Sequence, residues 1–549
     1  MKNNYKLFYI LLFVLALVVN FAGINVNFFT DDPGLYASIS KNLLYHKDIF
    51  QLFSLNQDWL DKPHFPFWMV MLSFKIFGVS VWAYRLPALL FFSLSLVYTW
   101  LFSKRFYGTE VACIAVLIVT TSLHVLISNT DIRAEPYLMA LITGSIYHIC
   151  RLEERYTFAG LFLASLLTAC AIMTKGMFVI VAIYGALLGQ LIFQKKLSSL
   201  VQIKWLLLFT LTLVFTLPEF YALYIQFDTH PEKNVFYRQN VSGIKWFLWD
   251  SQFGRFVNSG PITHKSGSIF FYVHTLLWAF APWCLLFYYA VYKTLKKIWL
   301  KIKLPEYYAI SGGGLLLLLF SLSGFQLPFY TNAIFPLFAI ITAPFCYEQL
   351  GKFATRYRLI SEWTYAVLFI IITLAIHILF KPASSIWFII DCVIFGVLML
   401  MVIKWVDKPH LKAFFITCSA ILFANFYLNT TVYGVLASYS GQMKAANYLN
   451  RPEFNQYHIY TVSTGTNIFQ YYSKRPVDFL PPDNFKQFKP SANSAIFAGK
   501  KFVDELKEKH ELFRVIKPFE NYPQENIIPA FINKATRNKV LDSVYLITK

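Results

Sequence analysis

Charge is what this sequence has least of. Only 14% of its 549 residues are Asp, Glu, Lys or Arg, whereas 57% are hydrophobic, and the mean hydropathy is +0.50. A soluble protein of this length does not need so much apolar surface, so most of the chain must face lipid or the inside of a helix bundle. The 49 basic residues outnumber the 29 acidic ones. Because many of them sit in short loops between apolar runs, the excess indicates membrane orientation rather than nucleic-acid binding.

Cysteine is also scarce in the polar parts of the chain. All seven Cys residues fall in or beside apolar runs, which excludes a disulfide framework and a CxxC metal signature. No nucleophile elbow, Walker loop, Rossmann glycine pattern or HExxH motif stands in a credible setting, so we expect neither metal nor cofactor. The basic start at Lys2 and Lys6 leads into an apolar run without a small-residue cleavage site, which predicts a retained first span.

What the chain does have is apolar runs. About thirteen of these runs have a length near the roughly 20 residues that a helix needs to cross a bilayer. They predict an α-helical polytopic membrane protein. They lie near residues 5–23, 81–102, 110–128, 134–150, 157–173, 176–193, 203–224, 268–291, 307–323, 326–346, 362–380, 384–403 and 411–431.

The loops between these runs set the orientation. With the N-terminus inside, the inner loops carry most of the Lys and Arg, as the positive-inside rule requires. This places the long loops 24–80 and 225–267 outside, and the odd number of spans carries the C-terminal region there too. We therefore expect a membrane domain over 1–435 and a small outer α/β domain over 436–549. In that domain 458–463, 494–499 and 543–549 read as strands, and 442–450 and 501–509 as helices. In the outer loop, 64–77 reads as an interfacial helix.

Two charged groups stand in the first outer loop. Asp31 and Asp32 precede the helix breakers Pro33 and Gly34, and Lys62 follows Asp61 in WLDKPHFPFW. A carboxylate can act as a general base, and a lysine ammonium binds phosphate as a point charge. The alternatives are a solvated helix end and a surface ion pair.

Three further segments carry candidate groups on the outer face. SNTDIRAEPYL (128–138) supplies Asp131 and Arg133 as substrate-binding candidates, unless the cluster merely neutralises itself at a helix end. In the segment 253–283 a guanidinium, an imidazole and an ammonium gather beside an aromatic-rich span, which suits a lipid phosphate unless the loop is simply solvated. They belong to Arg255, His264 and Lys265. The segment 321–340 places Pro328 and Tyr330 at a span entrance, where an ordinary kinked helix start is the simpler interpretation.

With these residues in view, the chain resembles the polyprenyl-phosphate-dependent glycosyltransferases of the GT-C class, in particular the lipid A aminoarabinose transferase (ArnT) branch, which is related to the protein O-mannosyltransferases (PMT). The resemblance covers residues 1–435. It rests on Asp31-Asp32-Pro33 with Tyr36-Ala37, Lys62-Pro63-His64, Lys175-Gly176, Arg255-Phe256, His264-Lys265, Phe271-Tyr272, and Ser321-Leu322-Ser323 with Leu327-Pro328 and Tyr330. The sequence departs from the family pattern at Asp32 (usually Glu), His64 (usually Pro) and Gln326 (often Lys).

The resemblance implies a GT-C fold in the bacterial inner membrane with its active site on the periplasmic face. It implies an undecaprenyl-type phosphate sugar donor, Asp31 as the base that activates the acceptor, and Lys62 and Arg255 as phosphate ligands helped by His264 and Tyr330. Lysine and arginine can stabilise the departing phosphate, so the transfer needs no metal. A single displacement would invert the anomeric centre.

Other interpretations remain open. The acceptor can be lipid A, another glycan or a protein, the last by PMT-type transfer. A transporter or flippase of lipid-linked sugars would need charges near the bilayer midplane and repeated halves. A sugar polymerase or ligase of another polytopic family, and a membrane scaffold, are the remaining alternatives. No nucleic-acid partner is expected.

Overall fold

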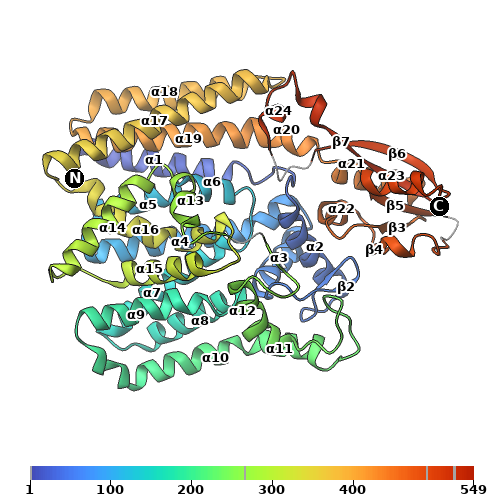
Figure 1. Cartoon of the computed structure of the whole chain (residues 1–549). Coiled ribbons are helices and arrows are strands. Elements are labelled where there is room, and N and C mark those ends of the chain that lie inside the picture. Colours follow the sequence, from blue (N-terminus) through green and yellow to red (C-terminus); the bar gives the residue numbers. More distant parts are fainter. Residues whose placement is uncertain (1–2, 265–266, 490–492, 523–526) are drawn as a thin grey trace.

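The computed structural model describes residues 3–264, 267–489, 493–522 and 527–549. Its larger part is a bundle of apolar helices, and its smaller part is a sheet domain (Figure 1). The bundle helices are α1 (Asn3–Phe21), α4 (Val81–Tyr107), α5 (Thr109–Thr120), α6 (Leu123–Ser128), α7 (Glu135–Glu154), α8 (Phe158–Lys175), α9 (Val179–Phe193), α10 (Ile203–Leu223), α13 (Phe271–Ala279), α14 (Cys284–Trp299), α15 (Tyr308–Leu322), α16 (Phe335–Tyr347), α17 (Lys352–Phe380), α18 (Ile386–Trp405) and α19 (Pro409–Tyr427).

Within the described residues, seven helical segments are long and apolar enough to cross a membrane. Five more are apolar but shorter, with 10–17 residues each. Every apolar run of the sequence contains one or two of the bundle helices. The polytopic helical class is therefore confirmed, whereas the count of thirteen spans remains a prediction.

Helix ends follow from local sequence. The Ser80 side chain caps α4 and the Thr157 side chain caps α8, each accepting a hydrogen bond from a backbone N–H of the first turn. At its other end α8 stops at Gly176, whose φ of 109° favours glycine. The Lys175-Gly176 pair on which the resemblance partly rests is thus a glycine-terminated helix end.

Two of the expected spans are broken rather than continuous. The run 110–128 divides into α5 and α6, and the run 268–291 divides into α13 and α14 beside Pro282, which cannot donate a helix hydrogen bond. The breaks meet: the Leu123 N–H donates to the Ala281 carbonyl at 2.8 Å, and the Trp283 indole donates to the Thr121 hydroxyl at 3.0 Å. Each break thereby satisfies polar groups that the other exposes inside the bundle.

The first outer segment forms α2 (Asp31–His46), the hairpin β1 (Phe53–Ser54) and β2 (Gln57–Asp58), and the apolar helix α3 (Phe65–Phe77). The second contains α11 (Gly243–Lys245) and α12 (Ser251–Phe256), joined by one turn of π-helix. Figure 1 shows α2, α3, α11 and α12 at the same end of the bundle, facing the sheet domain. The helix expected at 64–77 is confirmed.

The C-terminal region folds as α20 (Tyr433–Ser438), α21 (Gly441–Leu449), β3 (His458–Thr461), α22 (Asn467–Tyr472), β4 (Val477–Phe479), β5 (Ser494–Gly499), α23 (Lys500–Glu508), β6 (Arg514–Asn521), α24 (Pro529–Ile532) and β7 (Asp542–Thr548). The strand order is β4-β3-β5-β7-β6, with β3 parallel to both neighbours and β7 antiparallel to both of its own. The three expected strands and two expected helices are confirmed. β4, β6 and α22 were not predicted.

Two of the contacts that attach the sheet domain to the rest of the protein are made by helices. α22 packs on α2, and α24 reaches the outer end of α17. At α17 the backbone N–H of Lys534 donates to the Leu379 carbonyl at 3.0 Å, and the Arg537 guanidinium donates to the Phe380 carbonyl at 3.4 Å. The N-terminus and the sheet domain lie at opposite ends of the bundle in Figure 1.

Candidate active site

A cluster with one net positive charge forms where the first and second outer segments meet. Lys62 donates to one oxygen of Asp61 at 2.7 Å, and Arg255 of α12 donates to the other oxygen. Two cations and one carboxylate leave a surplus of one positive charge. Asp61, which was not among the expected site residues, therefore holds the two expected phosphate ligands side by side.

Burial and neighbouring charges tune this cluster. Burial would raise the pKa of Asp61, but Lys62 and Arg255 outweigh it and hold that pKa below its ordinary value. Burial, with the positive charge of Arg255, lowers the pKa of Lys62 to about 8 despite the opposing effect of Asp61. Asp61 therefore compensates the Lys62 ammonium only in part, and a further anion such as a phosphate would stabilise it.

A second ion pair lies deeper, at the outer end of α8. Lys175 pairs with Glu135, the first residue of α7, and both side chains are buried. The Lys175 ammonium also lies 4.1 Å from the centre of the Tyr330 ring and 5.4 Å from that of Phe329. Tyr330 and Phe329 belong to the 3-10 helix η4 (Pro328–Ile334) that opens α16. The expected site residue Tyr330 is thus joined to a lysine that the sequence indicated only as part of a turn.

The third cluster carries a surplus of negative charge. Arg133 pairs with Asp32 at 2.7 Å and with Asp131 at 3.2 Å, and Asp131 also accepts a hydrogen bond from the Thr30 hydroxyl. The Asp32 side chain is 49% exposed, more than that of either partner. Burial alone would lower the pKa of Arg133, but Asp131, Asp32 and Glu135 outweigh it and raise that pKa.

Phe329 joins the second and third clusters. The Arg133 guanidinium lies 4.3 Å from the centre of its ring, and Lys175 approaches the same ring. The site therefore presents a positive region at Lys62 and Arg255 and a negative region at Asp32 and Asp131, and the Phe329 ring contacts both Arg133 and Lys175.

Asp31 has a different environment from Asp32. Its carboxylate accepts the backbone N–H of Asn467 at 3.1 Å and also the side-chain amide of that residue, which begins α22. The pair that looks uniform in the sequence therefore divides, with Asp31 bound to the C-terminal domain and Asp32 paired with Arg133.

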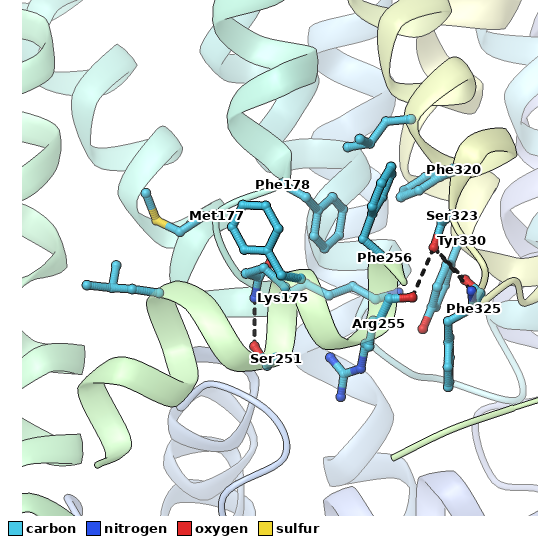
Figure 2. A pocket seen from close by; sticks show the side chains of 14 residues that line it. Lys175, Met177, Phe178, Ser251, Arg255, Phe256, Phe320, Ser323, Phe325 and Tyr330 are labelled. Atoms are coloured by element: carbon cyan, nitrogen blue, oxygen red, sulfur yellow. Dashed lines mark hydrogen bonds between the residues drawn. The ribbon is translucent and has the colours of Figure 1, made fainter. Parts of the chain in front are cut away.

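An apolar cavity of about 320 Å³ opens beside the positive cluster. Figure 2 shows Phe178, Phe256 and Phe320 around it, with Arg255 and Tyr330 among the polar groups of its lining. Lys175 also lines it. An apolar space with cations at its edge has the form required by a phosphate attached to a hydrocarbon chain.

His64 supports the loop that carries Lys62. Its ring is fully buried, with Nδ1 3.0 Å from Glu219 and Nε2 3.0 Å from the Phe50 carbonyl, and its backbone N–H donates to Glu219 at 3.0 Å. Both ring nitrogens and the backbone N–H of His64 are thus held by polar groups of α10 and of the preceding loop. The departure from the family's proline therefore gives hydrogen-bonding contacts that anchor the loop.

The remaining expected residues differ in outcome. His264 is exposed on its loop, where its ring lies 5.7 Å from that of Phe325 and its backbone bonds to the Asn258 side chain. Lys265 lies outside the described residues. The Gln326 amide is buried and donates to the carbonyls of Phe320 and Ser321, so it braces the turn before η4.

Comparison with known proteins adds three findings. Residues 61–221 match the family model "Dolichyl-phosphate-mannose-protein mannosyltransferase". A protein of Aquifex aeolicus (strain VF5) described as uncharacterised is 26% identical over 384 residues, which are 69% of this chain and 71% of that protein.

The third finding concerns solved structures of ArnT from Cupriavidus metallidurans. The crystal structure bound to undecaprenyl phosphate aligns with a TM-score of 0.75 at 15% identity, covering 100% of this chain and 98% of that one. The apo structure aligns with a TM-score of 0.73 at 15% identity, covering 92% and 95%.

The helical bundle with its outer sheet domain is therefore the GT-C fold of polytopic membrane proteins. More specifically, it is the fold of the solved ArnT structures, and residues 61–221 also match the mannosyltransferase family model.

Proposed function

We propose that the chain is a membrane glycosyltransferase that moves a sugar from a polyprenyl-phosphate donor to an acceptor on the periplasmic face of the bacterial inner membrane. The observation that carries the proposal is the junction of the apolar cavity with the cations Lys62, Arg255 and Lys175. A related fold holds undecaprenyl phosphate in the ArnT structure, which supports a lipid-linked donor here.

In this proposal the donor phosphate lies against Lys62 and Arg255, and its hydrocarbon chain follows the cavity. The cations stabilise the charge that grows on the phosphate as the bond to the sugar breaks. Asp61 fixes both cations before the donor arrives, so little reorganisation is needed during the reaction.

The base role belongs to Asp32 in this proposal. A general base must reach the acceptor, and Asp32 is half-exposed beside Arg133, whereas Asp31 is engaged by Asn467. Asp31 then positions the first turn of α2. Attack by the acceptor from the side opposite the phosphate would invert the anomeric centre.

As the first candidate acceptor we propose a lipid A-type glycolipid or another glycan. Transfer to a protein is the second candidate, which the match of residues 61–221 to the mannosyltransferase model favours.

The experiment is donor binding by the purified protein in detergent, with undecaprenyl phosphate as the probe. Arg255→Ala should weaken binding by about 2–4 kcal/mol, because a desolvated phosphate loses its charged partner. Arg238→Ala, in the same outer loop but exposed, is the matched control. Equal binding by the Arg255 variant and the control would place the phosphate elsewhere and overturn the proposal.

A further inference from the structure

A second cavity lies on the other side of α2, against the C-terminal domain. It measures about 420 Å³ and is formed by the second half of α2, the β1–β2 hairpin and the segment between α22 and β4. Its lining comprises Lys41, Asn42, Tyr45, His46, Phe53, Asn56, Gln470, Lys474, Arg475, Pro476 and Val477. None of these lining residues is acidic, whereas three are Lys or Arg and one is His.

The carboxylate of Asp478 accepts a hydrogen bond from Asn56 beside this lining, but among the described residues it forms no ion pair with the lining's Lys or Arg side chains. Lys41 donates to the carbonyls of Gln470, Tyr471 and Ser473 at 2.8–2.9 Å. Arg475 likewise donates to three backbone carbonyls. Carbonyl oxygens satisfy the donors but leave the formal charge, and the structure, over the residues it describes, has no ion pair at Lys41, Lys474 or Arg475. The cavity therefore holds a positive field that an anion would neutralise.

The other lining groups suit a sugar. The Asn42 and Asn56 amides donate to the Phe53 carbonyl and the Asp478 carboxylate, and the Gln470 oxygen accepts from Ser54. Each amide has further donor or acceptor capacity that can serve hydroxyl groups. The Tyr45 side chain is 60% exposed and offers an apolar ring face at the rim. Lys474 is exposed and adds an ammonium; over the described residues only its backbone N–H is hydrogen-bonded, to Asn450.

We infer that this cavity binds a phosphate-bearing saccharide. Its place on the molecule makes it a subsite for the acceptor, a role that rests on the proposed transferase function. Lys41 is nine residues beyond Asp32 on α2, about 14 Å along the helix axis and on the opposite side of the helix. An acceptor glycan of several sugar rings that passes around α2 can place its anionic end here while its reactive hydroxyl or amine lies at Asp32.

The test measures binding by the full-length protein in detergent without donor lipid, by calorimetry, with glucose 6-phosphate as the probe. We expect saturable binding at least tenfold tighter than that of glucose or of inorganic phosphate. Lys474→Glu should weaken it at least tenfold, and Lys474→Arg should retain it.

The matched control is Lys501→Glu, which makes the same charge change at an exposed residue of α23 outside the lining. It should bind as the unaltered protein does. Equal binding of glucose and glucose 6-phosphate, equal binding of inorganic phosphate, or unchanged affinity in a folded Lys474→Glu protein would each overturn the inference. Probe binding without any sugar transfer in the reconstituted system would instead overturn the proposed function and leave this site in place.

Discussion

Asp31 and Asn467 join the first outer helix of the bundle to the C-terminal domain. The Asp31 carboxylate accepts two hydrogen bonds at the N-terminus of α22, and Lys41 donates three to the carbonyls at its C-terminus. The anion therefore meets the positive end of the α22 dipole and the cation meets the negative end. α2 and α22 consequently run in the same direction, and the charges on α2 set the position of the outer domain.

The two adjacent aspartates should respond differently to neutralisation. Asp32→Asn keeps the shape of the side chain but removes the proton acceptor, so transfer should fall by about 10²-fold or more. Asp31→Asn should chiefly loosen the C-terminal domain and reduce transfer less. Initial rates of sugar transfer, with thermal unfolding as the fold control, decide this. A greater loss in Asp31→Asn with unchanged stability would restore Asp31 as the base.

Donor use should depend on the protonation of Lys62. Its pKa of about 8 in the free protein means that the ammonium is present below that pH and lost above it. The value of kcat/KM for the lipid donor should therefore decline above about pH 8. In Lys62→Arg this decline should disappear, because arginine stays charged. A pH–rate profile with the same alkaline limb in both proteins would contradict this role.

The buried pair of Lys175 and Glu135 should be important for stability. Glu135→Gln leaves a buried ammonium without its carboxylate, which costs about 3–5 kcal/mol. Glu154→Gln breaks the more exposed pair with Arg105 and should cost about 0–1 kcal/mol. Denaturant unfolding in detergent compares the two variants, and a similar small loss in both would contradict the expectation.

Gly34 should be required for docking of the C-terminal domain. A Cβ at this position would lie 2.9 Å from the Ile468 backbone nitrogen and 3.2 Å from the Asn467 carbonyl carbon, so the backbone of α22 would have to move. Gly34→Ala should destabilise the protein by about 1–3 kcal/mol and expose the domain to protease. At Gly434 an added Cβ meets nothing within 4 Å, so Gly434→Ala is the control. Identical proteolysis of both variants would show that the contact tolerates the methyl group.

The orientation can be tested by labelling. Lys501→Cys places a thiol on an exposed turn of the C-terminal domain, and Lys196→Cys places one in a basic inter-helix loop expected inside. A membrane-impermeant maleimide applied from the periplasmic side should react with position 501 and not with position 196. The reverse result would refute the topology and with it the periplasmic site.

The sequence predicted the apolar helices and the main strands because each of them is marked by its own run of apolar residues. The strand 494–499 has the bounds that its apolar run indicates, with five of its six residues buried. α22 was missed because a helix of six residues has little intrinsic stability and depends on the contacts with Asp31 and Lys41.

The sequence indicated many of the charged residues of the candidate site but not how they pair in space. Lys175 and Glu135 are forty residues apart, and Asp61 meets Arg255 across 194 residues, so neither pairing has a local signal. Asp31 and Asp32 are neighbours whose directions on a helix differ by roughly 100°. Which of them faces the site depends on how α2 is rotated against the bundle, and only the fold determines that rotation.

Three of the contacts of the outer domain have a mechanical consequence. The Asp31 and Lys41 contacts fix a line along α2, and the contact of Arg537 with the outer end of α17 lies away from that line. Because these three contacts do not lie on one line, they fix both the tilt of the domain and its distance from the bundle. When the bilayer thins or thickens, the domain must tilt together with the helices and cannot sink toward the lipid on its own.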